Sequence, residues 1–201
     1  METATLIALT GFAFASTWTP GPNKVMLAAS GATFGWRATL PHAMGVALGF
    51  PLMLFLIALG LGEVFQRSPA LRTGLAWAGM AVMLWLAWRI ATAGPSAGGR
   101  RARPLSFLEA SAFQWINPKA WAMAIGTAAT YASGAAPVLE AAIAALVFVG
   151  SGLTSANGWA GFGAALGRVL GTGRRLRLFN AAMGALLAGS AVWLVDRKSV
   201  V

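Results

Sequence analysis

The stretch Trp18-Thr19-Pro20-Gly21-Pro22-Asn23-Lys24 lies near the start of the 201-residue chain and closes a run without charged side chains, residues 3–23. A run of this length can cross a bilayer as a helix, which needs about 20 apolar residues. Pro20 and Pro22 have no backbone N–H, and each ring clashes with a carbonyl group one turn back. Gly21 between them adds conformational freedom. We therefore expect the first apolar helix to be broken within residues 19–23.

The composition of the whole chain is that of a membrane protein. Hydrophobic residues make up 58% of the chain and charged residues only 10%, whereas soluble domains carry about 25% charged residues. So few charges cannot cover a surface in water, which excludes a soluble enzyme. The net charge of +10 fits basic cytoplasmic loops better than nucleic-acid binding. With no cysteine in the chain, disulfides and thiolate metal sites are excluded.

Uncharged stretches predict an all-α integral membrane protein with six transmembrane helices in a single domain, residues 1–201, because charges are costly in hydrocarbon. We expect the fourth helix to begin near residue 105, so that it contains Glu109 and Lys119. The uncharged stretches are residues 3–23, 38–62, 73–88, 120–139, 141–167 and 178–195.

The two halves of the chain share landmarks in the same order. Trp18 precedes the Pro-Gly-Pro segment, and Trp115 precedes Ile116-Asn117-Pro118-Lys119; Pro41 and Pro137 follow at matching positions. We read these as a first repeat at about residues 1–95 and a second at about 104–198. Three helices in each repeat make the second inverted relative to the first. Inverted repeats with broken helices, here helices 1 and 4, are typical of secondary transporters.

The basic residues predict the orientation. The first, third and fifth loops hold more arginines than the termini and the other loops. Because cytoplasmic loops are enriched in Lys and Arg, both termini are predicted to lie outside the cytoplasm, in a multi-pass protein of the cell inner membrane.

A broken helix in lipid frees carbonyl groups that must be buried in protein or face a water-filled cavity. Such carbonyls can bind an ammonium group, and the N-terminus of the following half-helix can bind a carboxylate. We therefore predict a site for an amino acid zwitterion, with no catalytic residue, no metal ligand and no cofactor. The candidate substrate-binding residues are Thr19, Pro20, Gly21, Pro22, Asn23, Lys24, Gln114, Asn117, Pro118, Lys119 and Asn157.

Some of these residues have a second interpretation. Lys24 and Lys119 can instead extend to the membrane interface, and Asn157 can instead hold two helices together. Glu109 is the candidate for proton coupling, the alternative being a solvated position at the lipid headgroups.

The chain resembles the lysine-exporter (LysE/RhtB) family of translocators over essentially its whole length. The resemblance rests on six expected spans and on two motifs, Thr19-Pro20-Gly21-Pro22-Asn23 and Phe113-Gln114-Trp115-Ile116-Asn117-Pro118-Lys119-Ala120-Trp121. It implies an inner-membrane exporter of amino acids or related small solutes, driven by the electrochemical gradient rather than by ATP. Many members carry an acidic residue in the second span, but residues 45–51 here contain none, so a dibasic substrate is not favoured.

Other functions can be weighed from the residues alone. No phosphate-binding glycine-rich loop supports an ATP-driven pump, and one histidine without cysteine leaves little for an intramembrane enzyme. A small-cation or metal exporter of the same fold and a non-transporting membrane scaffold remain as alternatives. The expected partners are an amino acid and the lipid bilayer, and not nucleic acid. The small-residue pairs Gly45/Gly49 and Gly163/Gly167 allow close helix packing, within one chain or in a homodimer.

Overall fold

The computed structural model describes residues 1–93, 103–131 and 134–196, and this part of the chain contains helices and no strand. The elements are α1 (Thr3–Trp18), α2 (Pro22–Phe34), α3 (Trp36–Leu56), the π-helical turn η1 (Ile57–Leu61), α4 (Gly62–Arg67), α5 (Pro69–Ala91), α6 (Phe107–Ile116), α7 (Pro118–Tyr131), α8 (Pro137–Leu170) and α9 (Arg174–Asp196).

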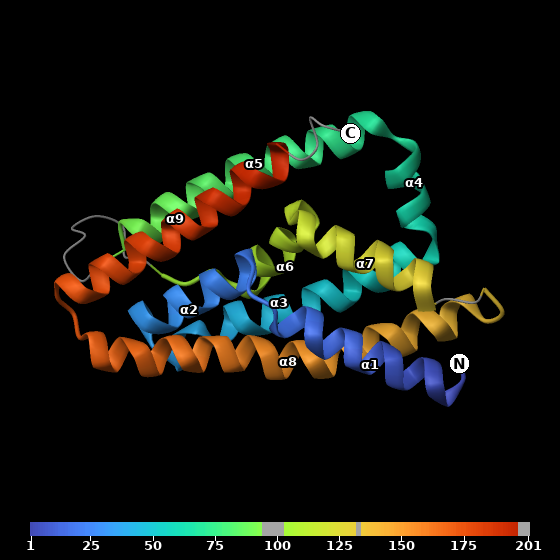
Figure 1. Cartoon of the computed structure of the whole chain (residues 1–201), viewed down its shortest axis with the longest axis horizontal. Coiled ribbons are helices and arrows are strands. Elements are labelled where there is room, and N and C mark those ends of the chain that lie inside the picture. The colour runs from blue at the N-terminus through green and yellow to red at the C-terminus, as the bar shows by residue number, and fades with distance from the viewer. Residues whose placement is uncertain (94–102, 132–133, 197–201) are drawn as a thin grey trace.

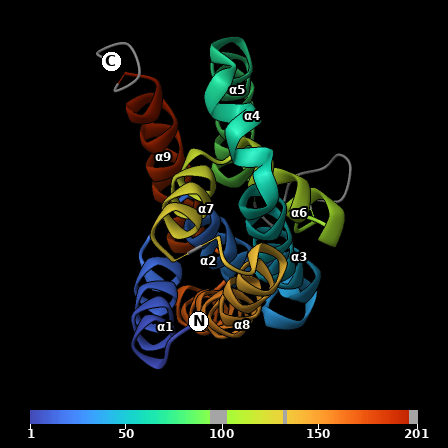
Figure 2. The ribbon, with the colours of Figure 1, turned by 90° about the vertical axis from the view of Figure 1, so that its right-hand side faces the viewer.

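The long helix α8 is the element around which the others pack (Figure 1). Helices α1 and α2 follow one another along it, and α3 packs against both α8 and α6. Helices α5 and α9 form an antiparallel pair that meets the rest of the molecule through α2 and α6. Figure 2 shows this pair standing apart from α1 and α8, with α7 between them.

Three helical segments are long and apolar enough to cross a membrane, Trp36–Arg67, Pro69–Ala91 and Pro137–Leu170, and Thr3–Trp18 is a shorter apolar helix. The predicted breaks are confirmed, since separate helices α1 and α2 flank residues 19–21 and separate helices α6 and α7 flank Asn117.

Two predicted boundaries are wrong, and both errors have the same cause. The first apolar segment does not end at Asn23, because α2 continues to Phe34. The fourth ends at Tyr131 rather than residue 139, and residues 137–139 belong to α8. In each case the charged residue taken as a boundary, Lys24 or Glu140, is buried with only 6% of its surface exposed. A charged residue that is buried within the protein does not by itself mark the end of a helix.

Small residues allow helices to approach within backbone contact, as predicted for both glycine pairs. A Cβ atom at Gly163 would collide with the Ala28 carbonyl oxygen of α2, and one at Gly167 would collide with that of Ala32. The Gly45/Gly49 pair faces α6 in the same way, and Ser111 Oγ donates to the Gly45 carbonyl at 3.1 Å. These contacts hold α2 against α8 and α3 against α6, inside one chain.

The two ends of the molecule differ in charge. The turn between α2 and α3, the C-terminal end of α5 and the turn between α8 and α9 lie together at the left of Figure 1. The N-terminus, α4 and the start of α8 lie at the opposite end. We call the left end the basic end, because it carries Arg37, Arg89, Arg103, Arg168, Arg174, Arg175 and Arg177.

The contact between α2 and α8 can be tested at Gly163. Replacing Gly163 with Ala forces the two helices apart, and we expect it to lower the free energy of unfolding by about 1–3 kcal/mol. Thermal unfolding of the purified protein in detergent measures the change. Gly161→Ala is the matched control, since a Cβ atom there would meet nothing within 4 Å. Equal stability of the two variants would contradict the packing described.

Candidate functional site

The break after α1 consists of three residues with no helical structure. Thr19 closes α1 through a hydrogen bond from its N–H to the Ala15 carbonyl at 3.1 Å. Gly21 is fully extended, with φ 176° and ψ −178°. Pro22 then begins α2, a favourable position because the first N–H groups of a helix have no partner within it.

The break before α7 is shorter. Asn117 is extended, with φ −89° and ψ 109°, and Pro118 begins α7. The Asn117 side-chain oxygen accepts a hydrogen bond from the Lys119 N–H at 3.1 Å, so Asn117 caps α7. This capped turn fixes where the Lys119 side chain leaves the helix.

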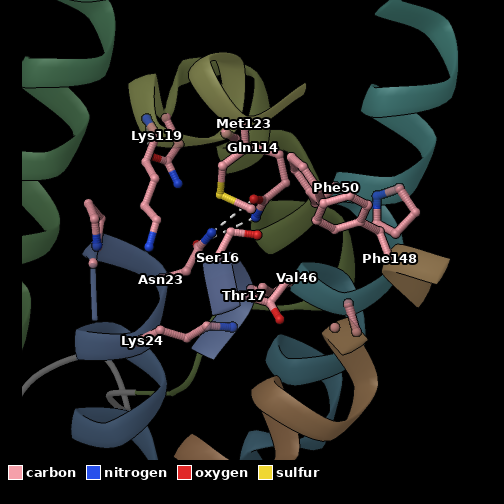
Figure 3. Close-up of a pocket in the computed structure, with 17 residues that line it drawn as sticks. Ser16, Thr17, Asn23, Lys24, Val46, Phe50, Gln114, Lys119, Met123 and Phe148 are labelled. Carbon is pink, nitrogen blue, oxygen red and sulfur yellow. Dashed lines mark hydrogen bonds between the residues drawn. The ribbon is translucent and has the colours of Figure 1, made fainter. Parts of the chain in front are cut away.

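The two breaks meet, although they lie in opposite halves of the chain. Lys119 Nζ donates to the carbonyl oxygen of Thr19 at 2.9 Å and lies 3.4 Å from that of Pro20. Asn23 Nδ2 donates to Gln114 Oε1 at 2.9 Å, the pair drawn with dashed lines in Figure 3. The prediction that the breaks face each other across a cavity is therefore confirmed.

The cavity between them, which we call the break cavity, has a volume of about 50 Å³. This holds a few water molecules, so an amino acid would enter only if the lining residues moved apart. The lining residues come from α1, the breaks, α2, α3, α6, α7 and α8: Ser16, Thr17, Gly21, Pro22, Asn23, Lys24, Val46, Ala47, Phe50, Pro51, Gln114, Asn117, Lys119, Ala120, Met123, Phe148 and Gly152.

Lys24 carries a buried positive charge into this cavity. Its side chain is 6% exposed, and its ammonium group has no hydrogen-bond or ion-pair partner within the described residues. It lies in the first turn of α2, where the helix dipole is positive and favours an anion. A buried charge is costly unless it is paired. The position therefore favours a bound carboxylate.

Lys119 is in the opposite situation. Its ammonium group lies at the C-terminal end of α1, where the freed carbonyl groups and the negative end of the helix dipole stabilise a cation. Figure 3 shows Lys119 and Lys24 on different sides of the Asn23–Gln114 pair. The cavity thus has a paired cation at one wall and an unpaired one at another.

Aromatic rings close the cavity on the side away from the basic end. Phe50 and Phe148 line it and meet edge to face, with ring centroids 5.2 Å apart. Phe12 lies 6.3 Å from Phe148, and Tyr131 lies 6.0 Å from Phe12. Phe50 lies one turn farther from the basic end than Val46 along α3, and Phe148 lies one turn farther than Gly152 along α8.

A second cavity of about 680 Å³ lies toward the basic end and is lined by His42, Arg89, Arg103 and Glu109, among others. Glu109 is therefore not part of the break cavity. Its carboxylate accepts hydrogen bonds from Arg103 at 2.6 and 2.8 Å and from the Ser106 N–H at 2.7 Å. Its role in proton coupling stays a prediction.

The structure brings most of the predicted residues together. Residues 21–24, Gln114, Asn117 and Lys119 line the break cavity, Thr19 supplies a carbonyl group, and Pro20 and Pro118 line the adjoining groove toward α9. Asn157 lies outside the lining, with its amide bonded to the Leu153 carbonyl at 2.9 Å. Its place in the site stays a prediction.

Sequence reasoning missed the walls supplied by α1, α3 and α8. Thr17 lies two residues before the break, and its carbonyl group accepts a hydrogen bond from Ser155 Oγ at 2.7 Å. The position of Thr17 beside the break could have identified it from the sequence as a residue of the site. Nothing in the sequence marks Phe50 or Phe148, because each resembles any other apolar residue of a membrane helix.

Comparisons with known proteins identify the family of this chain and several relatives. Residues 14–197 match the family described as LysE type translocator. The cysteine/O-acetylserine efflux protein of Escherichia coli (strain K12) is 34% identical over 119 residues, which cover 59% of this chain and 61% of that protein. The protein of the same name from Shigella flexneri serotype 5b (strain 8401) is 37% identical over 101 residues, covering 50% of this chain and 52% of that protein.

These alignments span less than two thirds of the length of either relative. No solved structure matches the chain. The family match, by contrast, extends over nearly the whole chain and includes both breaks. The chain belongs to the LysE type translocator family.

Proposed function

We propose that this protein exports small zwitterionic amino acids or related solutes from the cytoplasm across the inner membrane, and that the break cavity is the binding site. The observation that carries the proposal is the Lys24 ammonium group, buried at the start of α2 without a partner in the described part of the chain. The substrate's carboxylate would bind Lys24, and its ammonium group would bind the carbonyl groups of the break after α1. The amides of Asn23 and Gln114 lie between these two positions and offer both donors and acceptors.

The cavity walls favour a small, uncharged side chain. Val46, Phe50, Met123 and Phe148 give an apolar surface, with the polarisable Met123 thioether among them. No carboxylate lines the break cavity, so nothing there would pair with a second positive charge on the substrate. Cysteine and O-acetylserine, for which the two relatives are named, have this chemistry, and we propose solutes of this class as substrates.

For the membrane architecture we propose six spans in two inverted repeats. In this arrangement α1 with α2 forms the broken first span and α6 with α7 the broken fourth, while α3 to α4, α5, α8 and α9 form the others. The meeting of the two breaks supports it, since inverted-repeat transporters bind substrate where broken helices of the two halves face each other. The electrochemical gradient would drive the rocking of the halves, with Glu109 as the candidate proton carrier.

We place the basic end in the cytoplasm and both termini outside it, following the positive-inside rule. The 680 Å³ cavity would then open toward the cytoplasm, and the aromatic rings around Phe148 would close the outer side. A solute entering from the cytoplasm would thus reach the break cavity after the wide second cavity.

The role of Lys24 can be tested by replacing it with Met, which keeps the chain length and removes the charge. Loss of a hydrogen-bonded charge partner costs about 1.5–3 kcal/mol, so we expect the apparent affinity for exported cysteine or O-acetylserine to fall between tenfold and a hundredfold. Efflux of labelled solute from proteoliposomes over a concentration series gives the measurement.

Two controls make the result specific. Lys24→Arg keeps the charge and should retain much of the transport, whereas Lys198→Met removes the same charge near the C-terminus and should leave affinity unchanged. If Lys24→Met transported every tested amino acid with wild-type affinity, the carboxylate site would lie elsewhere.

The orientation can be tested at the two ends of α8, because the chain has no cysteine of its own. Val138 is 63% exposed at the start of α8, and Thr172 follows its end at the basic end. In intact cells we expect a membrane-impermeant maleimide to label Val138→Cys, and to label Thr172→Cys only after permeabilisation. The reverse pattern would show that the orientation is inverted.

A further inference from the structure

Lys119 binds the carbonyl groups that a substrate would need. Because α1 ends at Trp18, the carbonyls of Thr19 and Pro20 have no helical partner, and Lys119 Nζ lies 2.9 and 3.4 Å from them. Gly21 makes this approach possible: a Cβ atom there would lie 3.0 Å from Lys119 Cδ and 3.3 Å from its Nζ. A side chain at residue 21 would therefore press on Lys119, whose side chain would have to shift by a few tenths of an ångström.

The chemical requirement at this position is for a cation with several N–H donors. Freed carbonyl groups in a membrane are costly without partners, and the C-terminal end of a helix favours positive charge. The ammonium group of an amino acid meets both conditions, and so does the lysine ammonium group. The two groups are chemically equivalent here, and they cannot occupy the same carbonyls at once.

Space exists for Lys119 to move aside. A groove of about 1010 Å³ separates the two breaks from α9 and is lined by Gly21, Pro22, Lys119, Gly189 and Ser190, among others. Gly21, Pro22 and Lys119 line both this groove and the break cavity. The side chain can therefore leave the carbonyls without passing through the substrate's position.

We propose that Lys119 is a tethered substitute for the substrate's ammonium group. In the empty transporter its ammonium group holds the carbonyls of Thr19 and Pro20, and the arriving substrate displaces it into the groove beside α9. This inference rests on the proposed function, since it assigns a role within the same site. Lys119 is then a positioning residue that stabilises the empty transporter, and Lys24 remains the residue that contacts the carboxylate.

If Lys119 has this role, its loss should affect two modes of transport, exchange and net export, to different degrees. Exchange of internal for external solute keeps a substrate ammonium group on the carbonyls throughout, so it does not need Lys119. Net export requires the empty transporter to return, and without Lys119 that state would leave the carbonyls unpaired. A residue that contacts the substrate's carboxylate would instead affect both modes equally.

The test compares net efflux with exchange in proteoliposomes containing the full-length protein, with cysteine and O-acetylserine as labelled probes. For Lys119→Met we expect net efflux to fall by about tenfold or more, because unpaired buried carbonyls destabilise the empty state, and exchange to fall by a clearly smaller factor. Lys119→Arg, which keeps a cationic donor, should retain both modes.

A second variant alters the contact between Lys119 and the break without changing the lysine itself. Gly21→Ala places a Cβ atom against Lys119 and should slow net efflux more than exchange. Gly126→Ala is its matched control on α7, since a Cβ atom there would meet nothing within 4 Å. Agreement between the Gly21 and Lys119 variants would show that the contact itself controls the return step.

Three results would overturn the assignment. Equal loss of exchange and net efflux in Lys119→Met would make Lys119 a substrate contact or a structural residue. Unchanged net efflux would show that the empty transporter does not need the lysine. A wild-type protein that moves no amino acid in either mode would contradict the proposed function itself, and the role of Lys119 with it.

Discussion

Backbone carbonyl groups left without partners where α1 ends are the constraint on which the site depends. In a membrane these groups must be paired within the protein, and here the partner comes from the other half of the chain, through Lys119. Asn117 caps α7 and so sets the direction of that side chain. The two breaks therefore depend on each other, because one supplies acceptors and the other supplies the donor.

The breaks can meet only because the surrounding helices pack at backbone contact. Gly163 and Gly167 of α8 lie against α2, and Gly45 and Gly49 of α3 lie against α6. The contacts lie at Ala28 and Ala32 of α2 and near Phe107 and Ser111 of α6. They hold the two helices that carry Asn23, Lys24 and Gln114. Without a strong hydrophobic force between helices in lipid, such close van der Waals packing stabilises their association. The small residues thus determine the position of the polar ones.

Charge is distributed unequally at two scales. Within the site, Lys119 is paired with carbonyl groups while Lys24 has no partner in the described chain, which leaves a place for one anionic group. Across the molecule, arginines gather at the basic end, where the cavity of about 680 Å³ lies. Both features favour the binding of an anionic group.

The sequence by itself determined the membrane character, the helical class, both breaks and the glycine faces, because each depends on local chemistry. Proline lacks a backbone N–H in any environment, and a run of uncharged residues can be recognised directly in the sequence. Residues 21–24, Gln114, Asn117 and Lys119 were predicted for this reason, and the structure brings them together. The tertiary structure alone decided that Lys24 and Glu140 are buried within the protein, that Lys119 binds carbonyls, and that Phe50 and Phe148 line the cavity. Those properties depend on which helix faces meet, and residues distant in sequence set them.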